Sequence, residues 1–248
     1  MATPLLPLYG YCTPSHEILR DEWFLPSVRR WNEFDVRVIN GEQLPDGATY
    51  KSKDWGRGMQ SKVRAILRAI EECSGGVFVF SDMDIQYLRP SKDYLLAAIR
   101  NCDIAFQRNK PNGELCTGFF VCRANDATRA LWSSILEALE KDPSKDDQDC
   151  AQELLQRRSR LGMLFHFAGL FFLRSIGALS AVAFRAPGSA LRWKLLGPDV
   201  YLPGSMWTPG MPLRIPKAIL IHHANWTIGI DNKIAELRYV RETVESWK

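Results

Sequence analysis

The sequence predicts an α/β protein in which a largely parallel central sheet is flanked by helices. Short apolar segments alternate along the chain with longer segments whose apolar residues recur at helical spacing, as in chains of β–α–β units. Residues 77–80 form a wholly apolar run that follows two glycines, which is typical of a central strand buried on both faces. Residues 59–73 place their apolar side chains on one helical face and end at Ser74-Gly75-Gly76.

In the N-terminal half, the sequence predicts a strand, a helix, a second strand and a loop, in that order. Residues 5–12 alternate loosely between apolar and polar and end at Thr13-Pro14-Ser15, so they predict a strand followed by a turn. Helical spacing over 17–32 predicts a helix, and 35–39 predicts a second short strand. Residues 45–58 are polar and contain several glycines, so we expect a loop before the helix at 59–73.

The same patterns continue after the central strand. The expected helices cover residues 94–100, 126–141, 149–158 and 233–244, and the expected strands cover 104–107, 119–122 and 218–221. Asn125 or Asp126 is a suitable N-cap for the helix at 126–141. Gly118 is expected to form a turn before strand 119–122. Residues 197–212 hold three glycines and four prolines and predict a loop.

Length and composition fit one globular α/β domain of 248 residues. The chain is 46% apolar and 24% charged, which excludes a disordered or fibrous protein. Its net charge of +4 comes without a long basic block, so we expect no nucleic-acid partner. The six cysteines contain no Cys-x-x-Cys pair, and residues 1–10 lack the pattern of a secretory signal. These features favour reduced thiols and a cytoplasmic protein.

One segment could contact a membrane. Residues 163–184 are mostly apolar but are interrupted by His166 and Arg174, and three arginines precede them at 157, 158 and 160. A pair of buried helices broken near Gly177 is the preferred interpretation. Peripheral contact with anionic lipid through 157–184 is the second possibility, and a membrane-spanning helix is the third.

The strongest chemical signal is Asp82-Met83-Asp84, directly after the apolar run. Carboxylates two residues apart on an extended backbone point to the same side, and here they follow the carboxyl end of a buried strand, where open α/β sheets bind ligands. Such paired carboxylates are hard oxygen ligands for Mn²⁺ or Mg²⁺, and a cation there could also bind diphosphate oxygens. The alternative is a solvated loop that contains two unrelated acidic residues.

The second signal is His222-His223-Ala224-Asn225-Trp226 at the end of the last expected strand, followed by Gly229 and Lys233. A neutral imidazole can complete the ligand shell of a metal, and a lysine can bind phosphate as a point charge. A histidine on a strand is more often structural, so this segment taken alone leaves both interpretations open.

Together these pieces resemble the nucleotide-diphospho-sugar transferases, which are glycosyltransferases with the Rossmann-like GT-A fold, and within them the retaining type. The resemblance extends from about Leu8 to Val240. Its ordered pieces are Met59-Gln60-Ser61-Lys62, the DxD motif Asp82-Met83-Asp84 with Leu88-Arg89-Pro90, Cys116-Thr117-Gly118-Phe119-Phe120, Asp147-Gln148-Asp149, and His223-Ala224-Asn225-Trp226 with Gly229 and Lys233.

The resemblance implies one glycosyltransferase domain over 1–248. Residues 8–160 would form the nucleotide- and metal-binding core, 161–212 an acceptor-side or inserted segment, and 213–248 a closing strand and helix. Asp82, Asp84 and His223 would bind Mn²⁺ or Mg²⁺, and Asp147 or Asp149 would stabilise the reacting sugar. The residues implied in substrate binding are Tyr9, Gly10, Tyr11, Cys12, Thr13, Lys62, Asp82, Met83, Asp84, Cys116, Thr117, Gly118, His222, Asn225, Gly229 and Lys233.

The implied reaction is sugar transfer from a nucleotide-sugar donor, most simply a UDP-sugar, to a glycan, glycolipid or protein. A front-face route and a covalent route both remain open. Cys116 departs from the family pattern, which has asparagine there, and this leaves room for a non-catalytic module that only binds nucleotide sugars. A phosphohydrolase of the haloacid-dehalogenase type is a weaker alternative. The loop 197–212, with Met206 and Trp207, is a candidate acceptor contact.

Overall fold

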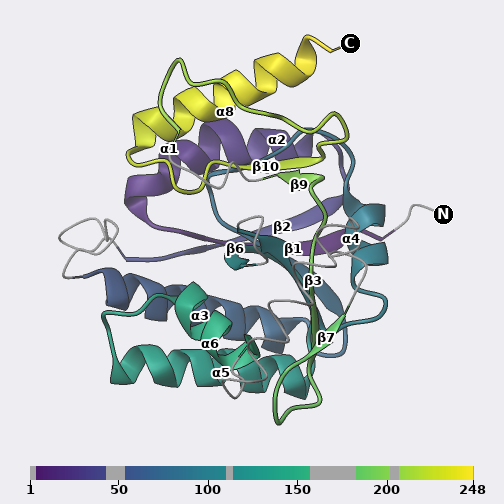
Figure 1. The fold of residues 1–248 in the computed structure, drawn as a ribbon, viewed down its shortest axis with the longest axis vertical. Coiled ribbons are helices and arrows are strands. Elements are labelled where there is room, and N and C mark those ends of the chain that lie inside the picture. Colours follow the sequence, from purple (N-terminus) through teal and green to yellow (C-terminus); the bar gives the residue numbers. More distant parts are fainter. Residues whose placement is uncertain (1–3, 43–53, 110–113, 157–182, 202–206, 248) are drawn as a thin grey trace.

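The fold is built on a twisted sheet with seven strands (Figure 1). The structure is a computed structural model and describes residues 4–42, 54–109, 114–156, 183–201 and 207–247. In spatial order the strands are β2 (Phe34–Asn40), β1 (Leu6–Cys12), β3 (Val77–Ser81), β6 (Leu115–Arg123), β5 (Ile104–Arg108), β8 (Arg192–Leu195) and β7 (Phe184–Arg185). A smaller sheet has the order β4 (Ile85–Tyr87), β10 (Ile221–His223) and β9 (Val200–Tyr201).

The central sheet is mostly parallel, as the sequence predicts. Strand β1 pairs in parallel with β2 and β3, and β5 pairs in parallel with β8. Strand β6 lies between β3 and β5 and is antiparallel to both, so β5 and β8 run in the same direction as β1, β2 and β3. Only β6 and β7 run the other way within the described sheet.

Helices cover both faces of the sheet (Figure 1). On one side lie α3 (Trp55–Glu72), α5 (Asp126–Lys141) and α6 (Asp147–Gln156); on the other lie α1 (Glu17–Leu19), α2 (Leu25–Arg29) and α8 (Ile230–Glu245). Helix α4 (Lys92–Ala98) packs beside the second group. Along β3 the side chains alternate between the two cores: Phe78 and Phe80 face α3 and α5, whereas Val79 faces the α1–α2 side. The apolar run is therefore buried on both faces, as predicted.

The predicted helix at 17–32 is present but irregular. A π-helical turn, Arg20–Phe24, separates α1 from α2, and the Leu25 N–H donates to Arg20 O instead of to the residue four before it. Pro26 explains the irregularity, because proline has no N–H to donate and its ring crowds the carbonyl four residues earlier.

Helix α3 begins at Trp55, whereas the sequence predicts a loop up to residue 58. Gly56 and Gly58 lie in its first turn, where glycine lowers intrinsic helix stability. Packing accounts for the difference, because a Cβ on Gly56 would lie 2.2 Å from Pro143 O. The remainder of the predicted loop, residues 45–53, lies outside the described residues.

Strand β6 also differs from the prediction. It runs without interruption through Gly118, which forms no turn. The short strands β4, β7, β8 and β9 give no clear sequence pattern and were not predicted, and β9 lies within the predicted loop 197–212. By contrast, α5 has the predicted bounds, and the Asn125 side chain accepts from Thr128 N–H in a capping box.

Candidate functional site

The site lies between the end of β3 and the start of β4, a strand of the smaller sheet. Asp82 and Asp84 follow β3 and precede β4, and β4 pairs with β10 so that His223 is opposite Ile85. One possible ligand atom from each of Asp82, Asp84 and His223 lies within 4.8 Å of the others. The structure therefore brings together the three residues that the resemblance implies as metal ligands.

Asp84 is held between two basic side chains. Lys233 Nζ, from α8, donates to Asp84 Oδ2 at 2.5 Å, and His223 Nε2 lies 3.2 Å from Asp84 Oδ1. Burial by itself would raise the pKa of Asp84, but Lys233 and His223 outweigh it and hold the pKa well below its usual range. The carboxylate is thus ionised and only 8% exposed, which suits it to bind a cation.

The ring of His223 has a fixed orientation. Its Nδ1 lies 2.7 Å from Gln107 Oε1, so Nε2 is the nitrogen that faces the carboxylates. Burial would lower the pKa of His223, but the charge of Asp84 outweighs this effect and raises it to about 10. A metal that binds Nε2 must therefore displace a proton from the imidazolium.

Lys62 ties the second carboxylate to α6. Its Nζ lies 3.1 Å from Asp82 Oδ1 and 3.3 Å from Asp147 Oδ2, and the lysine is only 7% exposed. Burial would lower the pKa of Lys62, but Asp147 and Asp82 outweigh it and raise the pKa. Lys62 is therefore a buried counter-ion between two carboxylates rather than an open contact surface for the donor. Asp147 joins the group through it, whereas Asp149 lies on an exposed position of α6.

Gly118 leaves the space in which these groups meet. A Cβ at this position would lie 2.6 Å from both Asp82 Oδ2 and His223 Cε1. The Gly118 N–H donates to Cys116 Sγ at 3.4 Å, and the Asn225 side-chain amide donates to the same sulfur at 3.6 Å. Thr117, between them in the chain, is buried. Cys116, Gly118 and Asn225 thus line the group as the resemblance implies.

At the end of β1, Tyr9, Gly10 and Cys12 are buried, whereas Tyr11 is partly exposed. Tyr9 is buried and its hydroxyl donates to Glu72 Oε2 at 2.8 Å, at the far end of α3, so it does not reach the carboxylates. Gly10 packs over the buried Met83 side chain, which lies beneath the DxD backbone. Cys12 is also buried. Tyr9, Cys12 and Met83 are thus buried, and substrate contact by them and by Gly10 stays a prediction.

Tyr11 lines a cavity of about 410 Å³ between the ends of β1 and β2 and one face of α3. Asn40 and Glu42 border it after β2, and Ser61, next to Lys62 on α3, forms part of its wall. Ionisation of Tyr11 is disfavoured because burial raises the pKa of its hydroxyl. The cavity has the position and size of a small-ligand pocket at the carboxyl ends of parallel strands.

His16 is a residue of this region that the sequence analysis did not select. Its Nδ1 lies 3.0 Å from Thr13 Oγ1, in the turn after β1. Burial lowers the pKa of His16, and the nearby charges of Asp84 and Lys233 also act on it. His16 follows the end of β1 by four residues. The same position at the end of a strand made Thr13 a candidate, so it could have indicated His16 as well.

Three other selected residues have structural surroundings. His222 is fully buried and lies 3.1 Å from Glu236 Oε1, on the opposite side of β10 from the carboxylates. Gly229 has φ of +88° and precedes α8. Trp207, expected near an acceptor, is 4% exposed and packs on Tyr239 with ring centroids 5.9 Å apart. Trp207 thus has the surroundings of a core anchor, its contact with an acceptor stays a prediction, and Met206 lies outside the described residues.

The membrane question concerns residues that are mostly undescribed. The segment 157–182 lies outside the described residues. The buried helix pair and the lipid contact therefore stay predictions. No helix in the described part of the chain is long and apolar enough to cross a bilayer.

Comparison with known proteins agrees with this geometry. The family model described as nucleotide-diphospho-sugar transferase matches residues 29–237. A glycosyltransferase involved in glycosylation of the major capsid of PBCV-1 is 11% identical, with 95% of this chain and 100% of that chain covered and a TM-score of 0.55. The bifunctional glycosyltransferase WbbM is 10% identical, with 98% of this chain and 51% of that chain covered and a TM-score of 0.52. No curated protein sequence gives a significant match. The structural likeness confirms the expected GT-A-like fold class.

Proposed function

Because the chain belongs to the nucleotide-diphospho-sugar transferase family, we propose that it is a metal-dependent, retaining glycosyltransferase. The proposed donor is a UDP-sugar, and the acceptor is a glycan, glycolipid or protein. The single observation that carries the proposal is the group of Asp82, Asp84 and His223, whose ligand atoms lie within 4.8 Å of one another.

The donor set fits a divalent cation. Two carboxylates and one imidazole match Mn²⁺ well and Mg²⁺ acceptably. Gln107 Oε1 lies 2.7 Å from Nδ1 of His223 and so holds Nε2 toward the cation position. Gly118 keeps clear the volume that a Cβ would fill. A cation bound there would neutralise charge on the diphosphate as the sugar bond breaks.

The chain's own residues supply orientation and charge. We assign the nucleoside to the cavity lined by Tyr11 and Asn40, because Ser61 in its wall precedes Lys62, the lysine that contacts Asp82. Lys233, beside Asp84, provides positive charge for the leaving phosphate. Asp147, buried next to Lys62, is the carboxylate available to stabilise positive charge on the sugar. We favour the front-face route, in which a phosphate oxygen accepts the proton of the acceptor hydroxyl.

A binding module without transferase activity is the second candidate, and Cys116 is the observation that favours it. The family asparagine at this position supplies an amide for the sugar, and a thiol cannot replace it. The Asn225 amide lies beside Cys116 Sγ, however, and is positioned to provide a similar donor. The six cysteines are unpaired, which supports a reducing compartment such as the cytoplasm.

The test is thermal unfolding with UDP-, GDP- and CMP-sugars, with and without Mn²⁺. We expect stabilisation that requires both Mn²⁺ and one class of nucleotide, because a ligand that binds only the folded state raises the melting temperature. Asp84→Asn should abolish this stabilisation. Glu153→Gln, which changes an exposed carboxylate of α6 that pairs with Lys145, is the matched control and should behave as the parent.

Product analysis separates the two candidates. Mn²⁺-dependent release of UDP, or transfer to an added glycan with the anomeric configuration retained, supports the transferase. Donor binding without release or transfer across a broad acceptor panel favours the binding module. Donor binding that survives Asp84→Asn would contradict the assignment of the site.

A further inference from the structure

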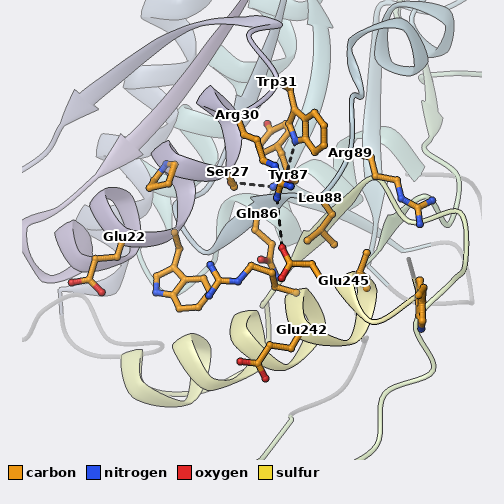
Figure 2. Close-up of a pocket in the computed structure, with 15 residues that line it drawn as sticks. Glu22, Ser27, Arg30, Trp31, Gln86, Tyr87, Leu88, Arg89, Glu242 and Glu245 are labelled. Atoms are coloured by element: carbon orange, nitrogen blue, oxygen red, sulfur yellow. Dashed lines mark hydrogen bonds and ion pairs between the residues drawn. The ribbon is translucent and has the colours of Figure 1, made fainter.

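A second cavity, of about 520 Å³, lies between α2, β4 and the C-terminal half of α8 (Figure 2). Its volume is in the range of pockets that bind small molecules, roughly 300–1,000 Å³. Arg30, at the end of α2, and Glu245, on α8, face each other across it. Gln86 and Tyr87 of β4 contribute to its wall.

This cavity is separate from the carboxylate site. Lys233, which contacts Asp84, and Glu245, which lines the cavity, are both on α8 and are twelve residues apart in the numbering. At 1.5 Å per residue this corresponds to about 18 Å along the helix. Neither the carboxylates nor His223 line the cavity. A ligand there would therefore not compete with the proposed donor.

Three indole rings line the cavity: Trp23, Trp31 and Trp247. Each is held by a cation on one face: Arg241 lies 4.3 Å from the ring centroid of Trp23, Arg30 lies 5.1 Å from that of Trp31, and Lys217 lies 4.0 Å from that of Trp247. Lys217 is not a lining residue, so it covers Trp247 from outside the cavity. The rings thus form a largely preset aromatic wall.

The charges of the cavity balance. Its lining includes the arginines 30, 89 and 241 and the glutamates 22, 242 and 245. Arg30 Nη1 and Glu245 Oε1 lie 3.6 Å apart, and both side chains are about half exposed. Because the two signs are equal in number, the cavity does not favour a phosphate or another strongly charged ligand. Guanidinium and carboxylate groups are planar and can each form paired hydrogen bonds with neighbouring hydroxyl groups.

One buried donor in the wall also lacks a partner. Trp23 is 6% exposed, and its indole N–H has no hydrogen-bond acceptor among the described residues. Buried donors in folded proteins are nearly always satisfied, so an oxygen of a bound molecule is a suitable acceptor. Arg241 lies over the face of this ring, 4.3 Å from its centroid, and both residues line the cavity.

We propose that this cavity binds an uncharged oligosaccharide, with apolar sugar faces against the half-buried rings of Trp31 and Trp247 and the hydroxyl groups held by the arginine and glutamate side chains. Trp23 is only 6% exposed, so it offers its N–H rather than a ring face. Saccharide binding here requires neither the cation nor the donor. Identification of the bound saccharide as the non-reacting end of a glycan acceptor rests on the proposed function.

The test is calorimetric titration of the full chain with neutral trisaccharides (maltotriose, cellotriose and mannotriose), without metal or donor. We expect at least one to bind the parent and the Asp84→Asn variant equally. Trp247→Ala should weaken this binding by at least about tenfold, as for a central aromatic contact. Trp23→Phe removes the indole N–H together with the ring that carries it and should weaken binding by about fivefold, with its unfolding temperature compared with that of the parent. Arg89→Ala should weaken it as well, whereas Arg129→Ala, on the exposed pair with Glu71, should not.

Three results would overturn the proposal. The first is no binding of any neutral trisaccharide by the parent at about 10 mM, where millimolar affinities are detectable. The second is unchanged binding in cavity variants that unfold at the parent's temperature. The third is selective binding of acidic saccharides or of peptides. Because no donor or cation is present, failure of the carboxylate site would leave these titrations unchanged, and the two proposals can fail independently.

Discussion

At the scale of single residues, the site depends on a glycine as much as on its charged side chains. Gly118 belongs to a central strand in which bulky residues are the rule, yet any side chain there would enter the space shared by Asp82 and His223. Lys62 fills the other side of the same carboxylate. The positions of the proposed ligands are thus set by a glycine on one side and a buried cation on the other.

We expect Gly118→Ala to fold but to bind Mn²⁺ about 10- to 100-fold more weakly, because Asp82 or His223 must move away from the added methyl group. Mn²⁺ titration by calorimetry measures this. Gly75→Ala is the matched control: Gly75 has φ of +76° and open space around it, so alanine should cost about 1 kcal/mol of stability and leave Mn²⁺ affinity unchanged. Equal Mn²⁺ affinity in Gly118→Ala and the parent would contradict the steric argument.

Residue types and spacing were enough to select Asp82, Asp84 and Lys233, because paired acids after a buried strand and a late lysine carry recognisable chemistry. They were not enough to decide which neighbours face the site. His222 and His223 differ by one position, and strand alternation sends them to opposite sides of β10. Both histidines therefore fit the sequence pattern equally well, as do Tyr9 and Met83, whose side chains are buried in the core.

At the scale of elements, local signals located helices well and tertiary contacts modified them. The bounds of α5 were predictable because its cap is local: Asn125 and Thr128 satisfy each other's backbone groups. The start of α3 was not, because Gly56 is tolerated there only through its contact with Pro143, in a turn far along the chain. The reversed direction of β6 likewise depends on pairings with β3 and β5 that no local pattern reports.

The cap of α6 provides a prediction about pH. Asp146 Oδ1 accepts from Asp149 N–H at 2.6 Å, and burial raises the pKa of Asp146 to about 6. A carboxyl whose pKa is raised on folding stabilises the protein below its ordinary pKa of 3.8, and that contribution is lost as pH rises through about 6. Asp146→Asn keeps a capping oxygen without the charge. We therefore expect it to be about 1 kcal/mol more stable than the parent at pH 7.5 and no more stable at pH 4.

Urea denaturation at several pH values measures this difference. Asp142→Asn is an informative control, because hydrogen bonds from Ser144 lower the pKa of Asp142. Its contribution is present above the ordinary carboxyl pKa and is lost as pH falls, so the two variants should respond to pH with opposite sign. A pH-independent effect of Asp146→Asn would show that the buried charge does not matter to α6.

At the scale of the whole molecule, the site is closed by the C-terminal part of the chain. Asp82 and Asp84 directly follow β3 of the central sheet, but His223 comes from β10 and Lys233 from α8. A fully buried network holds these late elements in place: Gln86 Nε2 of β4 lies 3.0 Å from His222 Nδ1 and donates to Leu237 O, and His222 contacts Glu236 of α8. The Thr227 hydroxyl donates to the same glutamate. Contacts between residues so distant in sequence could not be predicted from one sequence.

If this network positions α8, its loss should weaken donor binding from a distance. Glu236→Leu removes a buried partner of both His222 and Thr227, so we expect the unfolding free energy to fall by about 3 kcal/mol. We also expect UDP-sugar and Mn²⁺ to raise the melting temperature of this variant less than that of the parent, because Lys233 loses its fixed place beside Asp84. Glu236→Gln keeps one acceptor oxygen for His222 and offers an amide N–H to the hydroxyl oxygen of Thr227, so it should recover most of each effect. Arg238→Leu, at an exposed position of the same helix, should leave donor binding as in the parent. A destabilised Glu236→Leu variant with unchanged donor affinity would mean that the network supports the fold alone, and that Lys233 reaches the carboxylates without it.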